Sequence, residues 1–118
     1  MRVVNAQFVS PGGALVGGPL STGRTGGVPL LDFGNGQHLL AWTDDASNPD
    51  NHIFGQLISP AGAQGAPFPI SQALGDEDIG GVAAGIGGFL VTYYREVDPI
   101  QGLGRLYGRM VSTSGQLR

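Results

Sequence analysis

The chain has 118 residues, enough for a single domain with a modest hydrophobic core, and carries a formal net charge of −3. Its six basic residues are scattered arginines outnumbered by nine carboxylates, which excludes the basic stripe of a nucleic-acid-binding surface. The sequence has no cysteine and no run of about 18 apolar residues, so a disulfide framework, a thiolate metal site and a membrane-spanning helix are also excluded.

Glycine accounts for 22 of the residues, whereas only 13% of the residues are charged. The glycines have no three-residue period, which excludes collagen and favours a β protein rich in turns. No window of ten or more residues shows apolar side chains at helical spacing without an interrupting Gly or Pro, so we expect essentially no helix. No basic segment followed by an apolar core comes after Met1, so no signal peptide is expected and the compartment stays open.

The first half of the chain predicts four strands, which lie at 2–10, 14–21, 28–33 and 38–43. The first two are joined by a turn in which Pro11 suits the second position of a type I turn and Gly13 supplies a left-handed residue. A glycine-rich connection is expected at 22–27, and a tight turn at 34–36. The polar segment 44–51 contains Asn-Pro and Asp-Asn pairs and is expected to be a loop.

The second half predicts the same order of elements, with strands at 53–59, 66–71, 81–85, 89–94 and 105–112. An acidic connection is expected at 72–78 and a loop at 96–104. Three turns share the phrase S-[PT]-x-G, which predicts a left-handed backbone at Gly13, Gly62 and Gly115, because a type I turn followed by a G1 bulge needs a positive φ.

Two phrases recur along the chain in the same order. VNAQFVSPGGALVGGPLS at 4–21 matches IFGQLISPAGAQGAPFPIS at 53–71 and begins again as LYGRMVSTSGQL at 106–117, with the turn glycines 49 and 53 residues apart. HLLAWTDD at 38–45 matches FLVTYYRE at 89–96 at an offset of 51. A period near fifty residues with several short strands per repeat is typical of propeller blades and other repeat arrays.

The central strands are apolar on both faces. Ile53 and Leu57 lie on one side of the strand at 53–59, and Phe54 and Ile58 lie on the other. A sheet with one wetted face would alternate apolar with polar residues. We therefore expect each small sheet to be sandwiched between others.

The order IFGQLIS, a P-A-G turn, PFPIS and then GVAAGIGGFLVTYY resembles the tandem repeats of bacterial β-propeller-like proteins, and the likeness covers almost the whole chain. The resemblance implies an all-β domain over 1–118 built of four-stranded antiparallel blades, with repeats at about 2–50 and 51–103 and a partial repeat at 104–118. Its motifs are turn glycines and strand apolars, so it implies an architecture rather than a chemistry.

The number of repeats predicts a homo-oligomer. Two blades cannot close a ring, because propellers typically need about 4–8 blades. The first and the last predicted strands are of the same type, so one strand is left over after two repeats. We expect a dimer or a trimer of the chain, in which this ninth strand is exchanged between neighbours.

The candidate ligand-binding residues follow the strand that carries the second phrase in each half. An aromatic ring beside carboxylates and amides can stack on a sugar while the polar groups bind its hydroxyls. The alternative is that Trp42 and Tyr93, which occupy one repeat slot, only pack between blades. The candidates are Trp42, Asp44, Asp45, Tyr93, Tyr94, Arg95 and Glu96.

Neither metal binding nor a cofactor is expected. Two oxygen-rich groups could be considered for Ca²⁺, but both lack the order of an EF-hand loop and are interpreted as solvated: Asp44, Asp45, Asp50 and Asn51, and Asp76, Glu77 and Asp78. His38 and His52 lack the spacing of a zinc motif and are interpreted as surface or strand-end residues.

The sequence favours a non-enzymatic β repeat module that binds a ligand or partner through its loops, with a carbohydrate as the candidate ligand. It contains no G-x-S-x-G elbow, no Cys and no Lys, so nucleophilic catalysis finds no support. One alternative is a purely structural, self-assembling repeat fragment. A second is a glycoside hydrolase that uses Asp45 and Glu96, which share a repeat slot.

Overall fold

A computed structural model describes residues 2–46, 50–73, 75–98 and 100–118. Within these residues the chain forms strands and no helix, which confirms the all-β prediction. The strands are Val3–Val9 (β1), Leu15–Thr25 (β2), Leu30–Gly34 (β3), Gln37–Asp44 (β4), His52–Ile58 (β5), Phe68–Ser71 (β6), Glu77–Gly85 (β7), Gly88–Asp98 (β8) and Leu103–Ser112 (β9).

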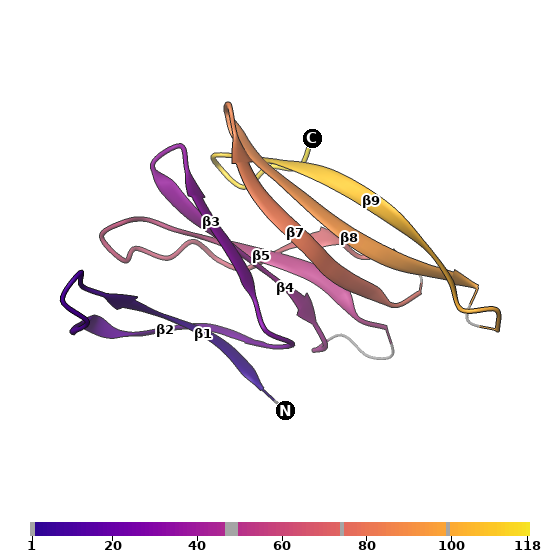
Figure 1. Cartoon of the computed structure of the whole chain (residues 1–118), viewed down its shortest axis with the longest axis horizontal. Helices are drawn as coiled ribbons and strands as arrows, with labels where there is room; N and C mark the ends of the chain where they lie inside the picture. Colours follow the sequence, from indigo (N-terminus) through magenta and orange to yellow (C-terminus); the bar gives the residue numbers. More distant parts are fainter. Residues whose placement is uncertain (1, 47–49, 74, 99) are drawn as a thin grey trace.

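The strands form three antiparallel sheets, each made of strands that follow one another in the chain. They are the hairpin β1–β2, a central sheet of order β3-β4-β5-β6 and a C-terminal sheet of order β7-β8-β9. The hairpin lies against one side of the central sheet and the C-terminal sheet against the other, so the fold is a stack of three layers (Figure 1). The N-terminus and the C-terminus lie on opposite sides of this stack (Figure 1).

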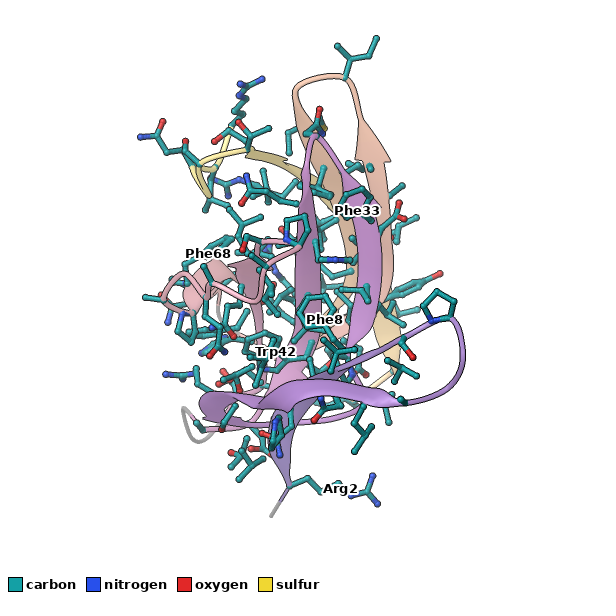
Figure 2. The ribbon with its side chains drawn as sticks, turned by 90° about the vertical axis from the view of Figure 1, so that its left-hand side faces the viewer. Arg2, Phe8, Phe33, Trp42 and Phe68 are labelled. Carbon is teal, nitrogen blue, oxygen red and sulfur yellow. The ribbon has the colours of Figure 1, made fainter. Side chains whose placement is uncertain are left out.

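Two hydrophobic cores separate the layers, because the side chains of β4 and β5 alternate between the two faces of the central sheet. The core toward the hairpin contains Val4, Leu40, Trp42, Phe54 and Ile58, with Phe8 packed against it (Figure 2). The core toward the C-terminal sheet contains Leu39, Ala41, Ile53, Ile70, Phe89, Val91, Tyr93 and Val111. The prediction that the central strands are buried on both faces is therefore confirmed. The expectation that each sheet is sandwiched between others holds for the central sheet but not for the two outer layers, whose outer faces are exposed in the described residues.

One turn occurs three times in the chain with the same hydrogen bonds. The amide of Gly62 donates to the carbonyl of Ser59 at 2.9 Å, and Gly13 and Gly115 make the equivalent bond at 2.9 and 3.0 Å. The three glycines have φ angles of 88°, 91° and 84° in chain order. These values confirm the predicted left-handed conformation, which side chains with a Cβ rarely adopt.

The structure differs from the sequence predictions at the polar ends of the strands. The expected connections at 22–27, 72–78 and 96–104 are partly strand, since β2 continues to Thr25, β7 begins at Glu77, and β8 and β9 extend to Asp98 and from Leu103. A partner strand pairs with each polar segment, for example Glu77 with Arg95 across β7 and β8. Cross-strand pairing thus extends strands through residues whose own preference is for a loop.

Candidate functional site

A groove opens between the central and C-terminal sheets, at the end of the stack where β4 ends and β7 begins. We call it the interlayer groove; it is lined by Gly27, Val28, Thr43, Asp45, Asn51, Asp78 and Ile79. Its volume of about 560 Å³ is within the range of small-molecule sites. The carboxylates of Asp45 and Asp78 are exposed in this groove.

Hydrogen bonds between the layers hold the polar groups of the interlayer groove. The Thr43 hydroxyl accepts a hydrogen bond from the amide of Ile79 at 2.9 Å and lies 3.5 Å from the carboxylate of Asp78. The Thr25 hydroxyl donates to the carboxylate of Asp45. The donors and acceptors are therefore fixed by strands of all three sheets rather than by loop conformation alone.

The acidic loops beside the groove are bound to each other. The amide of Gly75 donates to the Asp50 carboxylate at 3.1 Å, and the amide of Asn51 donates to the Asp76 carboxylate at 2.9 Å. The amide of Glu77 also donates to the carbonyl of Asn51 at 3.2 Å. Asp50 and Asp76 thus satisfy backbone donors of the facing loop, which corrects the interpretation that these residues only face water.

A second groove lies next to the first, along the outer side of the C-terminal sheet. We call it the outer groove; it is lined by Asn51, Asp76, Asp78, Tyr94, Arg95, Glu96, Gly102, Leu103 and Gly104. Tyr94 is 56% exposed and Glu96 is exposed. Asn51 and Asp78 line both grooves, so the two form one continuous polar surface.

Asp44 is not part of this surface but of a buried ion pair. Its carboxylate accepts hydrogen bonds from Arg24 Nε at 2.8 Å, from Arg24 Nη2 at 2.9 Å and from the indole of Trp42 at 3.0 Å. The Arg24 guanidinium lies 3.9 Å above the ring of Phe54. Burial would by itself raise the pKa of Asp44, but the hydrogen bonds from Arg24 and Trp42 and the charge of Arg24 outweigh it, so the pKa lies below its usual range.

Glu77 forms a second buried ion pair, with Arg95. The Glu77 carboxylate lies 3.1 Å from Arg95 Nε and accepts a hydrogen bond from Ser71 at 2.6 Å. The Arg95 guanidinium lies 4.2 Å above the ring of Tyr107. Burial would lower the pKa of Arg95, but the hydrogen bond and charge of Glu77 raise it. Asp44 and Glu77 are therefore structural charges rather than solvated ones.

Three of the predicted ligand-binding residues are buried, and this corrects their assignment. Trp42 is 0% exposed, and Asp44 and Tyr93 are also buried, so none of them has a surface on which a ligand could lie. Trp42 and Tyr93 instead belong to the two hydrophobic cores, as the packing interpretation predicted. Trp42 lies on β4, which is buried on two faces, whereas Tyr93 lies on the one face of β8 that packs against the central sheet.

The remaining predicted residues lie in the grooves. Asp45 lines the interlayer groove, whereas Tyr94, Arg95 and Glu96 line the outer groove. The sequence prediction missed Thr43, although it occupies the repeat slot of Tyr94 at the offset of 51. That offset was the available signal, but a lone Thr in a strand has no distinctive chemistry.

The two histidines lie near strand ends and outside both grooves. His38 follows the first residue of β4 and contacts the rings of Phe8 and Phe33, and His52 is the first residue of β5. Within the described residues, no three His, Asp or Glu side chains are arranged to hold a metal ion. The same part of the chain contains no helix that is long and apolar enough to cross a membrane.

No protein-family model, curated protein or solved structure matches the chain.

Proposed function

We propose that the chain is a non-enzymatic β repeat module of propeller-like architecture that binds a polyhydroxylated ligand, such as a glycan, in the interlayer groove. The observation that carries the proposal is the convergence of two exposed carboxylates, an amide and a hydroxyl, at Asp45, Asp78, Asn51 and Thr43. Carboxylates and amides accept and donate the directional hydrogen bonds that sugar hydroxyls need.

The propeller-like architecture is supported by how the layers pack. The C-terminal sheet packs on the central sheet through one face, and the central sheet packs on the hairpin through one face. The residues of these two faces occupy the same positions of the repeat. The matching positions are Leu40 and Val91, Trp42 and Tyr93, Phe54 and Tyr107, and Ile58 and Val111. Packing of this kind is head to tail, as between successive blades, rather than face to face as in a two-fold pair.

The two grooves also correspond to each other slot by slot. At the offset of 51 residues, Thr43, Asp45 and Gly27 of the interlayer groove match Tyr94, Glu96 and Asp78 of the outer groove. A repeated groove supports a binding function, because binding at several weak sites increases avidity without any new contact.

A hydrolytic role is less well supported by the geometry. Glycoside hydrolysis needs two carboxyl groups on opposite sides of one sugar bond. Asp45 and Glu96 line different grooves, and Asp45 already accepts a hydrogen bond from Thr25. The proposal is therefore a binding site without a catalytic pair.

A glycan array followed by calorimetry on the best glycan tests the proposal. Asp45→Asn and Asp78→Asn should each weaken binding about tenfold, since a hydrogen bond to a charged group contributes roughly 1.5–3 kcal/mol. Arg118→Gln is the control, because it also removes one charge and Arg118 is exposed and lines neither groove. Failure of the wild-type chain to bind any glycan, or full affinity in both Asp variants, would contradict the proposed function.

The second candidate function is that of a structural module that assembles with copies of itself into a dimer or a trimer. It is favoured by large apolar side chains that are exposed on the two outer faces of the stack. On the hairpin these are Val3, Val9 and Leu15, and on the C-terminal sheet they are Leu90, Leu103, Leu106 and Met110. Apolar surface of this kind is typical of protein interaction sites.

A further inference from the structure

The two outer layers are incomplete versions of the central sheet, and they lack different strands. In the order β3-β4-β5-β6, β5 holds the third place, and β1 and β9 match β5 at offsets of 49 and 53 residues. The hairpin β1–β2 therefore corresponds to the third and fourth places, and β7-β8-β9 corresponds to the first three. Together the two outer layers supply strands for all four positions of a sheet. Both β1 and β9 correspond to the third position.

The side of the central sheet beside β1 shows the consequence of the missing strands. Leu31 and Phe33 of β3 are 56% and 51% exposed on this side, and Phe33 points outward from the ribbon (Figure 2). Their repeat equivalents Val82 and Ala84 are partly buried against the core between the central and C-terminal sheets. In the described part of the chain no strand pairs with the edge of β1 that faces away from β2.

We propose that β7 and β8 of one copy and β1 and β2 of a second copy form one composite four-stranded sheet. In this sheet β1 of the second copy pairs with β8 at the place that β9 occupies within a single chain. The occupant is a second copy, because β7 and β8 are the strands of this chain that match the two missing ones. The composite sheet would cover Leu31 and Phe33 of the second copy and continue the head-to-tail stacking of the two existing interfaces.

The composite sheet also completes the outer groove, and this part of the inference rests on the proposed function. In the interlayer groove, Asp78 and Ile79 of the next sheet form the wall opposite Thr43 and Asp45. The outer groove has Tyr94 and Glu96 in the matching slots, but no described residue of the same chain forms the corresponding opposite wall. The repeat offset assigns that wall to Gly27 and Val28 of the second copy.

Disulfide trapping in the full-length chain tests the composite sheet, and the absence of native cysteine makes the readout specific. Thr92 pairs with Gly108 in the β8–β9 ladder, and Gly108 corresponds to Ala6 at the combined offset of 102 residues. A composite sheet therefore places Thr92 opposite Ala6 of the second copy. Under mild oxidation, A6C/T92C should give covalent species of two or more chains on a gel without reductant.

Two variants serve as controls. N5C/T92C keeps one cysteine and moves the other to the opposite face of β1, so it should cross-link at least tenfold less than A6C/T92C. T92C/G108C shows whether β9 is paired with β8, because a disulfide between these two positions of one chain forms only in that arrangement. Efficient cross-linking in T92C/G108C together with none in A6C/T92C would overturn the composite sheet. Glycan binding at the interlayer groove is measured separately, so either proposal can fail without the other.

Discussion

At the scale of single residues, the main feature is a pair of buried carboxylates that each hold a guanidinium over an aromatic ring. Asp44 pairs with Arg24 above Phe54, and Glu77 pairs with Arg95. The ring below Arg95 is Tyr107, which occupies the same repeat slot as Phe54. In the first site the acid is on β4 and the base on β2, whereas in the second the acid is on β7 and the base on β8. The shared feature is the position of the guanidinium above the ring. Removal of one partner would leave the other charge buried without compensation.

The first residue-scale prediction concerns the pH dependence of stability. Because the pKa of Asp44 is lowered in the folded protein, its contribution is present above the unfolded carboxyl value of about 3.9 and is lost as the pH falls through the lower folded value. Asp44→Asn should therefore lower the free energy of unfolding by about 3 kcal/mol at pH 7. The difference from wild type should begin to shrink below about pH 4, by at most about 1.4 kcal/mol per pH unit, until the pH reaches the lower folded pKa.

Urea denaturation at several pH values measures this difference. Asp78→Asn is the control, since Asp78 is exposed and its loss should change stability little. An Asp44→Asn variant whose deficit is the same at pH 3 and pH 7 would mean that the ion pair with Arg24 is not what Asp44 contributes.

At the scale of elements, the hairpins depend on one turn geometry. Ser10, Ser59 and Ser112 each accept the turn hydrogen bond through the carbonyl, and each hydroxyl accepts a further amide hydrogen bond four residues on. The glycine before that amide is left-handed in every case. This geometry sets the register of β1 with β2, and it directs the segment after β5 back toward β6.

We predict that Gly62→Val destabilises the protein by more than about 1 kcal/mol, because a β-branched residue is strained at a positive φ. The Cβ itself would not clash, since at Gly62 it would meet only Phe8 at 3.9 Å. Gly65→Val is the matched control: it lies in the same connection without a left-handed φ. Thermal melts of both variants measure the effect, and equal melting temperatures would contradict the assignment of strain to the turn.

At the scale of the whole molecule, the chain exposes apolar surface on both outer faces of its stack. It has few charged residues that could prevent these faces from associating with other copies. Leu106 is 61% exposed on the outer face of the C-terminal sheet, in the slot that Ile53 fills inside the core of the central sheet. Within the described residues, no strand pairs with the edge of β1 that faces away from β2, and the outer edge of β9 is bonded near its end, where Val111 bridges to Leu117. The remaining backbone donors and acceptors of these edges lie beside this surface. Natural proteins block such edges with charge or proline, or cover them with another chain.

We therefore expect sedimentation equilibrium at micromolar concentration to give a mass of two or three times the 12.1 kDa of the chain. Leu90→Glu should weaken association at least tenfold, because Leu90 is 41% exposed on the outer face of β8 and the change would place a charge in an apolar interface. Ile100→Glu is the control, since Ile100 is 95% exposed in the turn between β8 and β9 and away from that face. A wild-type mass near 12.1 kDa would count against self-assembly.

Features that depend on near neighbours in the chain could be predicted from the amino-acid sequence alone. The left-handed glycines at 13, 62 and 115 follow from the residues of each turn, because a positive φ is a local steric matter. The two-sided burial of β5 follows from the alternation of Ile53 and Leu57 with Phe54 and Ile58. These features made the strands and their order predictable.

The burial of some polar residues and the position of others in the grooves depend on contacts between strands that are far apart in the sequence. Arg24 and Asp44 are 20 residues apart, and Glu77 and Arg95 are 18 apart, so no local pattern distinguishes these acids from the exposed Asp45 and Asp78. The energetic cost of burying a carboxylate depends on whether a guanidinium lies beside it, and that is determined by how the strands pair. Strand pairing also explains why β7 begins within a run of acidic residues, since Glu77 pairs with Arg95. Contact between the sheets likewise explains why Thr43 lines the interlayer groove, since its hydroxyl bonds to Ile79.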